Sequence, residues 1–380
     1  MSSLNVKNKI SPPPQNTDDT QNHKSIAISG IHRGENPQPG AAVIASIRRH
    51  FPDIRIIGLS YDPLESSLYS KGIDRPDVAY LMPYPGTGSD ELLNRLESII
   101  KAENVGYIIP CLDLEILGYI AISEQLSQWG VQCVLPESSS LHNISKLNLY
   151  DFCQKINIPS PVTKVATDLL SLQHLAEENG YPIYVKGRYY EAELVHSTPE
   201  LIDTGRKLSR EWGWPLILQE MVNGEEYDIV GLGSGDGQII QSCAIRKFQR
   251  TETGKGLAGI VVEDPKLDQL AEKIIKELKW NGPFELEFLK APLGDHTLFE
   301  INPRFPAWVD FPSQIGCNLP VRLIEQLKGI KFTPLRSCTA GQMFVRHSID
   351  LVGDISELAD MSNTGKRTFK DYTTNVELPK

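Results

Sequence analysis

Apolar and polar positions alternate in short blocks along the first third of the chain. The run Ser25–Ser29 has the pattern of a short buried strand, and residues 41–50 follow it with a helical pattern. Residues 91–102 carry leucine and isoleucine spaced as on one face of a helix. Further runs of strand length lie at 54–59, 78–82, 107–111 and 131–135. Short strands that alternate with helices predict a parallel sheet with crossover helices.

The pattern changes after residue 139, where hairpins replace this alternation. Residues 227–233 and 238–247 are strand-like and are joined by Ser234-Gly235-Asp236-Gly237, which is typical of a tight turn. Residues 284–289 and 298–302 flank a second turn-like sequence around Gly294 and predict another hairpin. Further strands are expected at 181–186 and 216–222, and helices at 146–156 and 266–279. Hairpins mixed with helices indicate an α+β domain.

These patterns divide the chain into four segments. Residues 1–24 contain Pro12-Pro13-Pro14 and few apolar residues, which predicts a disordered tail. We expect an α/β domain at 25–138, an α+β domain at 139–330 and an extension at 331–380, in which 342–346 is strand-like.

Composition and charge narrow the function classes without naming one. Of the 380 residues, 40% are hydrophobic and 23% are charged, as in ordinary globular proteins. The net charge of −10, with no block of lysine and arginine, argues against nucleic acid or an anionic membrane as a partner. The six cysteines form no CxxC pair, as expected of free thiols in a reducing cytosol. No apolar run has the length of a membrane span, and the first residues lack the apolar core of a signal peptide, so we expect a cytoplasmic protein.

Carboxylates alternate with apolar residues on both strands of the second hairpin. The two sequences are Phe284-Glu285-Leu286-Glu287-Phe288-Leu289 and Leu298-Phe299-Glu300-Ile301-Asn302. Facing positions of an antiparallel pair have a constant index sum, and a loop centred at 293–294 makes that sum about 587. Glu287 then faces Glu300, and Glu285 faces Asn302. Side-chain alternation directs the apolar residues to the core, namely Phe284, Leu286, Phe288, Phe299 and Ile301.

The other face of this hairpin gathers oxygen ligands. Facing carboxylates repel one another, so the arrangement costs stability unless a cation lies between them. Glu287, Glu300 and Asn302 supply the hard oxygen atoms that Mg²⁺ prefers, with water and phosphate completing its coordination. Arg304 follows closely and has the planar guanidinium that binds phosphate oxygens in pairs. The spacing therefore predicts a magnesium and phosphate site.

The segment Glu300-Ile301-Asn302-Pro303-Arg304, preceded by Glu287, resembles the metal-binding signature of the ATP-grasp superfamily. It is most similar to the carbamoyl-phosphate-synthase large-chain-like branch. Four more segments occur in the order found in that family: Ile245-Arg246-Lys247, residues 254–259, Asp264-Pro265 with the helix that follows, and Gly316-Cys317-Asn318-Leu319-Pro320. The resemblance covers residues 25–330. It implies a Rossmann-like pre-ATP-grasp domain followed by a two-lobed ATP-grasp domain that uses ATP and Mg²⁺, with Mn²⁺ as an alternative ion.

The same resemblance implies two phosphate-binding lysines and two catalytic arginines. Lys146 and Lys186 match the positions of the family's lysines. Lys186 also ends a predicted strand beside a loop, where its charge is aimed at an anion. Arg246 and Arg304 are the expected catalytic residues, as ligands of phosphate or substrate.

Residues 218–227 resemble the hinge between the two lobes of the family. By that resemblance, Glu220 and the backbone of Met221 and Val222 bind adenine. Glu226 accepts hydrogen bonds from the ribose hydroxyls.

One segment departs from the family pattern. After the second lysine the family carries a glycine- and serine-rich loop that covers the phosphates with backbone N–H groups. This chain has Gly187-Arg188-Tyr189-Tyr190-Glu191-Ala192, with one glycine. Either Arg188 supplies a guanidinium in place of those donors, or the loop is shorter and more ordered.

The first domain allows a second interpretation. Gly30, Gly34 and Gly40 lie between a strand and a helix, and Asp62 follows the second strand, which loosely matches a dinucleotide site. The spacing is not GxGxxG, and in ATP-grasp relatives this domain helps to hold the acceptor substrate. Asp113, at the carboxyl end of a predicted strand, is therefore a candidate substrate contact.

The resemblance implies an ATP-dependent carboxylate–amine ligase, which activates a carboxylate as an acylphosphate for attack by an amine or thiol. Its expected partners are small-molecule or peptide carboxylates and amines, and a homodimer is left open. One alternative is a nucleotide-binding partner or regulatory subunit with little turnover. Another is a bicarbonate-activating enzyme that forms carboxyphosphate. Trp308, Asp310 and Phe311 differ from the small residues that often follow the signature and are candidates for the acceptor pocket.

Overall fold

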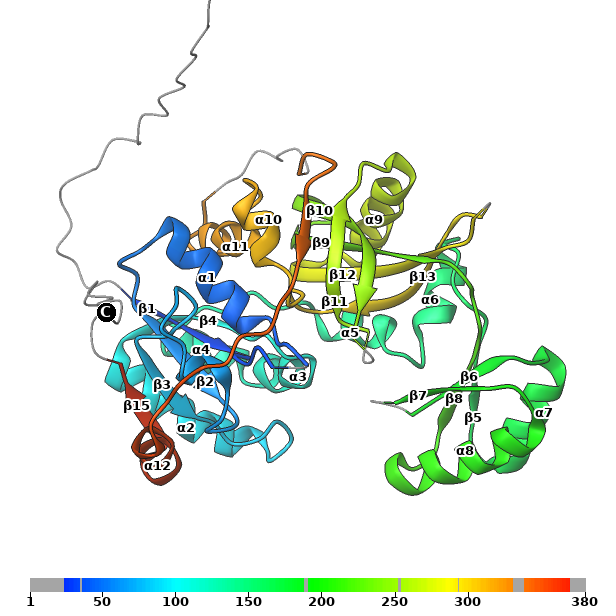
Figure 1. The fold of residues 1–380 in the computed structure, drawn as a ribbon, viewed down its shortest axis with the longest axis horizontal. Coiled ribbons are helices and arrows are strands. Elements are labelled where there is room, and N and C mark those ends of the chain that lie inside the picture. Colours follow the sequence, from blue (N-terminus) through cyan, green and yellow to red (C-terminus); the bar gives the residue numbers. More distant parts are fainter. Residues whose placement is uncertain are drawn as a thin grey trace, which may run out of the picture.

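The computed structural model describes residues 24–369, except 35, 188–190, 252–253, 293 and 331–337. Its described strands form sheets of five, six and four strands. Figure 1 shows the five-stranded sheet at one end of the molecule, the six-stranded sheet beside it and the four-stranded sheet in a lobe that stands apart. One mainly parallel sheet and two antiparallel sheets confirm the expected combination of α/β and α+β architecture. The tail predicted at 1–24 lies, apart from Lys24, outside the described residues.

Four of the five strands of the N-terminal sheet are parallel, in the order β3-β2-β1-β4. Alternate residues of the central strand enter two different cores, because Ile26 and Ile28 lie in one apolar cluster and Ala27 lies in another. A strand buried on both faces is apolar throughout, which explains the short apolar runs of the sequence. The elements of this domain are β1 (Ser25–Ser29), α1 (Gly40–His50), β2 (Ile56–Ser60), η1 (Ser66–Leu68), β3 (Val78–Leu81), α2 (Ser89–Glu103), β4 (Val105–Ile109), α3 (Asp113–Ala121) and α4 (Ser123–Gln128).

The strand predicted at 131–135 is wrong. Gln132 forms one isolated bridge with Tyr107, and the chain then leaves the sheet. The carbonyl of Leu135 accepts a hydrogen bond from Asn281 Nδ2 at 3.1 Å. The start of β12 (Asn281–Lys290) thus holds this segment, so that it does not continue along β4.

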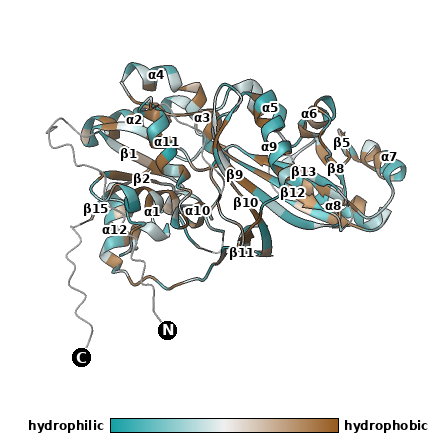
Figure 2. Ribbon diagram, turned by 90° about the horizontal axis from the view of Figure 1, so that it is seen from above, coloured by the Kyte–Doolittle hydropathy of each residue, from teal (hydrophilic) through white to brown (hydrophobic). Residues whose placement is uncertain are grey.

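The six-stranded sheet is antiparallel, with the order β13-β12-β9-β10-β11-β14. Both predicted hairpins and the predicted strand at 342–346 are present in it. The apolar face of the sheet packs against α9, whose N-cap Asp264 accepts the N–H groups of Lys266 and Leu267. Figure 2 shows α5 and α9 beside β12 and β13. The bounds are β9 (Glu225–Ser234), β10 (Ile239–Arg250), β11 (Gly256–Val261), β13 (His296–Asn302), β14 (Met343–Val345), α5 (Ser138–Ile144), α6 (Leu149–Lys155) and α9 (Pro265–Leu278).

The small lobe has a four-stranded antiparallel sheet with the order β5-β8-β6-β7. Its own apolar core lies between this sheet and two helices. The first of these helices begins with a capping box, in which Asp168 and Ser171 bond each other's backbone N–H groups. The elements are β5 (Thr163–Ala166), α7 (Leu169–Asn179), β6 (Ile183–Lys186), β7 (Ala192–Val195), α8 (Thr198–Trp212) and β8 (Leu216–Glu220).

The N-terminal sheet and the six-stranded sheet share an apolar core. Helix α1 packs against α10 (Asp310–Gln314) and α11 (Leu319–Leu327). Polar contacts frame this interface: Asn318 Nδ2 donates to Ser46 O at 2.8 Å, and Arg49 pairs with Asp310 at 3.0 Å. Asp310 was a candidate for the acceptor pocket, but its carboxylate is engaged in this helix contact.

The C-terminal segment connects the two sheets a second time. It leaves β14 at the edge of the six-stranded sheet and reaches α12 (Ile355–Thr364) and β15 (Lys366–Thr368) at the edge of the N-terminal sheet, as the orange-to-red ribbon of Figure 1 shows. None of the helices in the described ranges combines the length and apolar character needed to cross a membrane.

Candidate active site

The hairpin of β12 and β13 has the register predicted from its sequence. Glu285 faces Asn302, and Glu287 faces Glu300. The register shifts by one after Glu287, so that Phe288 faces Leu298. This bulge buries Leu298 in the core and leaves Phe299 partly exposed. The pairing of the acidic residues is therefore confirmed, and the assignment of Phe299 to the core face is wrong.

A buried lysine lies among the carboxylates of this face. Lys247 of β10 places its Nζ 2.8 Å from Asp228 Oδ2 and 2.9 Å from Glu287 Oε2, and Glu226 Oε2 is 3.5 Å away. Strand β9 runs between β10 and β12, and its Asp228 is directly opposite Glu287. Charges removed from water interact strongly, so this lysine and its carboxylates depend on one another.

Arg304 forms a neighbouring cluster with Glu285. Its Nη1 is 2.5 Å from Glu285 Oε2, and its Nε is 3.4 Å from Asp113 Oδ2. Glu285 also accepts hydrogen bonds from Trp308 Nε1 at 3.2 Å and from Asn302 Nδ2 at 3.1 Å. The Asn302 amide donates to Glu287 as well, at 2.8 Å, and so links the two clusters. Because Asp113 begins α3, the carboxyl edge of the N-terminal sheet reaches the hairpin here.

The carboxylates of the two clusters differ in their pKa values. Burial raises the pKa of Asp228 well above its usual range, although Lys247 acts to lower it. Burial also raises the pKa of Glu287, with Glu285 and Glu300 adding to the rise and Lys247 opposing it. Burial acts in the same direction on Glu285, but Arg304 and Lys247 outweigh it, and the pKa of Glu285 is lowered. Negative charge is therefore in excess around Glu287, where a further cation would be favourable.

Glu287, Glu300 and Asn302 fit a magnesium ion in their donor chemistry. Glu300 is partly exposed, and its carboxylate makes no hydrogen bond or ion pair with the residues that the structure describes. Over the same residues, no three His, Cys, Asp or Glu side chains are grouped as a metal site. A site of two carboxylates and one amide agrees with Mg²⁺, which keeps several ligands from water and phosphate.

Lys186 faces this hairpin from the small lobe. Its Nζ donates to Gln219 Oε1 at 2.6 Å. Burial lowers the pKa of Lys186 to about 8, while Glu300 and Glu287 act to raise it and Lys146 acts to lower it. These interactions indicate that the two expected lysines and two of the expected metal ligands lie in one region. A buried lysine of this kind becomes more easily charged when an anion binds beside it.

The expected nucleoside ligands lie on the connection between the small lobe and the six-stranded sheet. Glu220 is exposed at the end of β8 and accepts the N–H of Val162 at 3.1 Å. Met221 and Val222 follow it and are partly buried. Glu226, the second residue of β9, forms ion pairs with Arg250 and Lys247. Glu226 therefore contacts the acidic cluster, whereas Glu220 lies at the far end of the connection.

Arg246 does not join the other expected phosphate ligands. Successive residues of a strand point to opposite faces. Arg246 pairs with the exposed Glu225 at 3.0 Å and lies 5.0 Å from the ring centre of Phe248. Lys247, the next residue on β10, occupies the acidic cluster instead. The alternation along β10 was visible in the sequence, but its phase relative to β9 and β12 was not.

Two further residues of the site were missed in the sequence. Asp228 continues the alternation of acidic and apolar residues that begins at Glu226-Tyr227. This alternation could have placed Asp228 on the same face as Glu226. Lys255 lies just before β11, where burial and then Arg304 lower its pKa, against Glu285 and Asp113. No pattern in the sequence distinguishes Lys255 from a surface lysine.

Residues 188–190 of the glycine-poor segment, including Arg188, lie outside the described residues.

A second group of buried carboxylates lies at the carboxyl edge of the N-terminal sheet. Glu115 accepts a hydrogen bond from Ser29 Oγ at 2.5 Å, and Glu65 accepts the N–H of Tyr61 at 3.2 Å. Burial raises the pKa of both carboxyl groups to about 7.

The glycine-containing turn beside this group is explained by packing. A Cβ at Gly40 would lie 1.9 Å from Ser29 O, so a glycine is required for α1 to approach β1. This close approach accounts for Gly40 without a bound dinucleotide.

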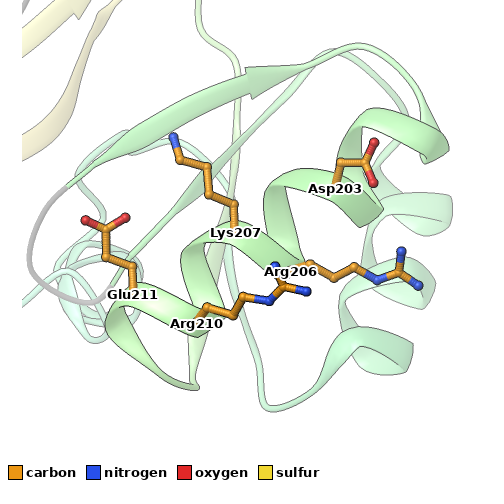
Figure 3. A pocket seen from close by; sticks show the side chains of 5 residues that line it. All are labelled: Asp203, Arg206, Lys207, Arg210 and Glu211. Atoms are coloured by element: carbon orange, nitrogen blue, oxygen red, sulfur yellow. The ribbon is translucent and has the colours of Figure 1, made fainter.

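Helix α8 carries a shallow surface depression, shown in Figure 3. Charged side chains of both signs line it, and Lys207 among them pairs with Glu193 at 2.5 Å. The lining residues are Asp203, Arg206, Lys207, Arg210 and Glu211. None of them belongs to the acidic hairpin or to its lysines, so this depression is separate from the candidate site.

No protein-family model matches the chain. Its fold is similar to solved structures of three enzymes. A biotin carboxylase–β,γ-ATP complex from Campylobacter jejuni is 16% identical with a TM-score of 0.64, over 82% of this chain and 72% of the other. An L-amino acid ligase from Bacillus licheniformis is 14% identical with a TM-score of 0.61, over 81% and 75%. The biotin carboxylase domain of Hydrogenobacter thermophilus 2-oxoglutarate carboxylase, with MgADP, ADP and bicarbonate, is 17% identical with a TM-score of 0.64, over 84% and 73%. The chain therefore shares the fold of these enzymes, in which a mainly parallel N-terminal sheet precedes two antiparallel sheets.

Proposed function

We propose that the protein is an ATP- and Mg²⁺-dependent ligase, which activates a carboxylate for attack by an amine or thiol. The observation that carries this proposal is the face of the β12–β13 hairpin, where Glu287, Glu300 and Asn302 lie together beside Arg304. The similarity to an L-amino acid ligase and to carboxylases bound to nucleotides supports it. Residues 25–138 would act as the pre-ATP-grasp domain, 139–330 as the ATP-grasp domain and 331–380 as an extension.

Glu287, Glu300 and Asn302 would hold Mg²⁺, which when bound neutralises charge on the β- and γ-phosphates. Lys186 of the small lobe and Lys146, between α5 and α6, would bind phosphate oxygens. The nucleoside would lie against the connection between the lobes, with adenine at Glu220, Met221 and Val222 and the ribose at Glu226.

The reaction would proceed in two displacements. A carboxylate oxygen of the acceptor attacks the γ-phosphorus of ATP, ADP leaves, and an acylphosphate forms. The amine then attacks the acyl carbon, inorganic phosphate leaves, and the amine loses a proton. Arg304 would stabilise the negative charge that develops during these steps. Neither step requires a side-chain nucleophile.

The test is ADP release from the full chain with panels of amino acids, dipeptides and bicarbonate, with mass spectrometry of the products. We expect Mg²⁺-dependent ADP release with carboxylate–amine pairs. Replacing both Glu300 and Asn302 by Ala should lower the rate of ADP release by a factor of about 100 or more, because Mg²⁺ loses two of its protein ligands. Glu272→Ala, an exposed change on α9, is the matched control.

The outcomes separate the proposal from its alternatives. ADP release with bicarbonate alone would indicate a carboxyphosphate-forming enzyme. ATP binding in calorimetry without ADP release from any pair would indicate a nucleotide-binding subunit. Turnover that is unchanged in the double variant, with binding of Mg²⁺ also unchanged, would exclude the assigned metal site.

A further inference from the structure

One arginine of the C-terminal segment is partly buried, and one of its terminal nitrogens has no hydrogen-bond partner among the described residues. Arg346 directly follows β14, and its backbone N–H donates to Leu257 O at 2.7 Å. Its Nη1 is buried and makes no hydrogen bond within the part of the chain that the structure describes. Buried polar groups of folded proteins are nearly always hydrogen-bonded, and an unpaired buried charge is costly. The guanidinium of Arg346 therefore points to a ligand.

The strand geometry relates Arg346 to the acidic hairpin. Residues two positions apart on a strand point to the same face, so Arg346 shares the face of Phe344. The ring of Phe344 stacks on Trp308, with 6.4 Å between the ring centres and 12° between the ring planes. Trp308 in turn donates to Glu285. Glu285, Trp308, Phe344 and Arg346 thus form a row that leads from the acidic cluster toward the N-terminal domain.

The charged neighbour of Arg346 is a second arginine. Arg33 lies in the loop after β1, where its backbone N–H donates to Ser66 Oγ at 2.6 Å and its Nε is 3.2 Å from Asp74 Oδ2. Burial and the positive charge of Arg33 lower the pKa of Arg346 to about 10, so the group is still charged at neutral pH. Asp74 compensates one of the two charges. Among these three described side chains, one positive charge is left over between the N-terminal domain and the C-terminal segment.

We propose that Arg346 and Arg33 bind an oxyanion, a carboxylate or phosphate group, which the acceptor substrate carries away from its reacting carboxylate. This inference rests on the proposed function. The reacting end would lie at Arg304 and the acidic cluster, and the stacked rings of Trp308 and Phe344 lie between the two positions. The acceptor class is then an acid with a second anionic group beyond an apolar segment.

Acceptors of matched length test this assignment. Hexanoate has one carboxylate, adipate has two, and 5-phosphonopentanoate carries a phosphonate in place of the second carboxylate. We expect ADP release with a kcat/KM at least about 10-fold higher for the two doubly charged acids, as for a charge-assisted hydrogen bond. The better of those two acids distinguishes a carboxylate from a phosphate group.

Arg346→Met should raise the KM of the doubly charged acceptors at least about 10-fold and leave the KM of hexanoate and of ATP unchanged. Arg346→Lys should restore part of the preference for doubly charged acceptors, because lysine has the positive charge but not the paired N–H donors of arginine. Arg322→Met, which breaks a pair with Glu325 on α11, is the matched control. An equal loss of activity with hexanoate and adipate would overturn the inference.

A binding measurement keeps this test independent of turnover. Calorimetry with adipate and with inorganic phosphate should show binding that weakens at least about 10-fold in Arg346→Met. The melting temperature of the unliganded variant should not fall, because the change removes an unpartnered buried charge. Arg346-dependent binding without any ADP release would refute the ligase and leave the oxyanion-binding site itself standing. Absence of Arg346-dependent binding overturns the inference, whatever the ADP-release screen gives.

Discussion

Buried carboxylates occur in two places, on the β12–β13 hairpin and at the edge of the N-terminal sheet. The two groups differ in the partners that surround them. On the hairpin, Glu285 and Glu287 lie within ion-pair distance of Arg304 and Lys247. At the sheet edge, Glu115 has the hydroxyl of Ser29 as a partner, and no described lysine or arginine forms an ion pair with it. In the first group, cations lower the pKa of Glu285 and oppose the rise that burial causes in the pKa values of Asp228 and Glu287. The second group avoids charge by holding protons.

The difference identifies the group that is suited to chemistry. A carboxylate held ionised beside a cation can bind a metal ion or oppose a moving charge, but it leaves a buried charge whenever one partner is lost. A carboxylic acid that is neutral below about pH 7 can join strand ends without a cation, at the cost of a pH-dependent stability. The hairpin therefore has the electrostatics that the proposed active site requires, whereas the carboxyl groups at the sheet edge are suited to a structural role.

The largest expected effect is that of removing the buried lysine. Lys247→Met leaves Asp228 and Glu287 without their shared cation, and it should lower the free energy of unfolding by about 3–5 kcal/mol. Urea denaturation at neutral pH measures this loss. The double variant with Asp228→Asn should lose less than the sum of the two single changes, because the charge left unpaired is also removed.

Arg246→Met is the matched control for Lys247→Met. Arg246 is the next residue on the same strand, but it pairs with a carboxylate that is 59% exposed. Its loss should cost less than about 1 kcal/mol. Equal losses in the two variants would show that the acidic cluster does not depend on Lys247.

A smaller effect is expected at the sheet edge, with a different pH dependence. The pKa of Glu115 is about 7 in the folded protein and 4.5 in an ordinary environment, so the folded state binds the proton more tightly. The resulting stability is fully present below pH 4.5 and is lost as the pH rises through 7. Glu115→Gln keeps a neutral side chain, so it should remove on the order of 2 kcal/mol of the decline in stability between pH 5 and pH 8.

The measurement is urea denaturation at several pH values, compared with Glu124→Gln. Glu124 is exposed on the neighbouring helix α4, so its replacement should leave the pH profile unchanged. A wild-type stability that rises between pH 5 and pH 8, or a Glu115→Gln profile parallel to that of the wild type, would contradict the proposed proton on this group.

The sequence was most informative about the β12–β13 hairpin, where side-chain alternation and antiparallel pairing are enough to predict which residues face one another. The alternation of Glu285, Glu287, Glu300 and Asn302 with apolar residues set both the register and the face of the hairpin. It could not foresee the bulge after Glu287, because local sequence does not determine on which strand an extra residue is accommodated. Phe299 and Leu298 exchanged places for that reason.

Positions that depend on distant neighbours were not predictable. The choice between Arg246 and Lys247 required the register of three strands, of which β9 and β12 are separated by more than 40 residues of sequence. The segment 131–135 has the composition of a strand, but the start of β12 draws it away from the sheet. Arg33, the positively charged neighbour of Arg346, lies in the loop after β1, and no local pattern relates the two.

The smallest effect concerns a third carboxylate, which extends the comparison within the N-terminal domain itself. Glu103, at the end of α2, bonds Tyr80 Oη at 2.5 Å, Arg55 at 2.5 Å and Lys366 of β15 at 3.1 Å. Burial acts to raise its pKa, but these three partners together lower it. Lys366→Gln should cost less than about 1 kcal/mol at pH 7, because Lys366 is half-exposed and two partners remain. The loss should shrink as the pH falls through the lowered pKa of Glu103, which is opposite to the direction expected for Glu115.

Urea denaturation at pH 7 and pH 3.5 measures the loss in the free energy of unfolding and its change with pH. Lys101→Gln, which removes the exposed pair with Glu97, is the control. Glu103 has two cationic partners, so it should tolerate the loss of one of them. A loss in the free energy of unfolding as large for Lys366→Gln as for Lys247→Met would contradict this explanation.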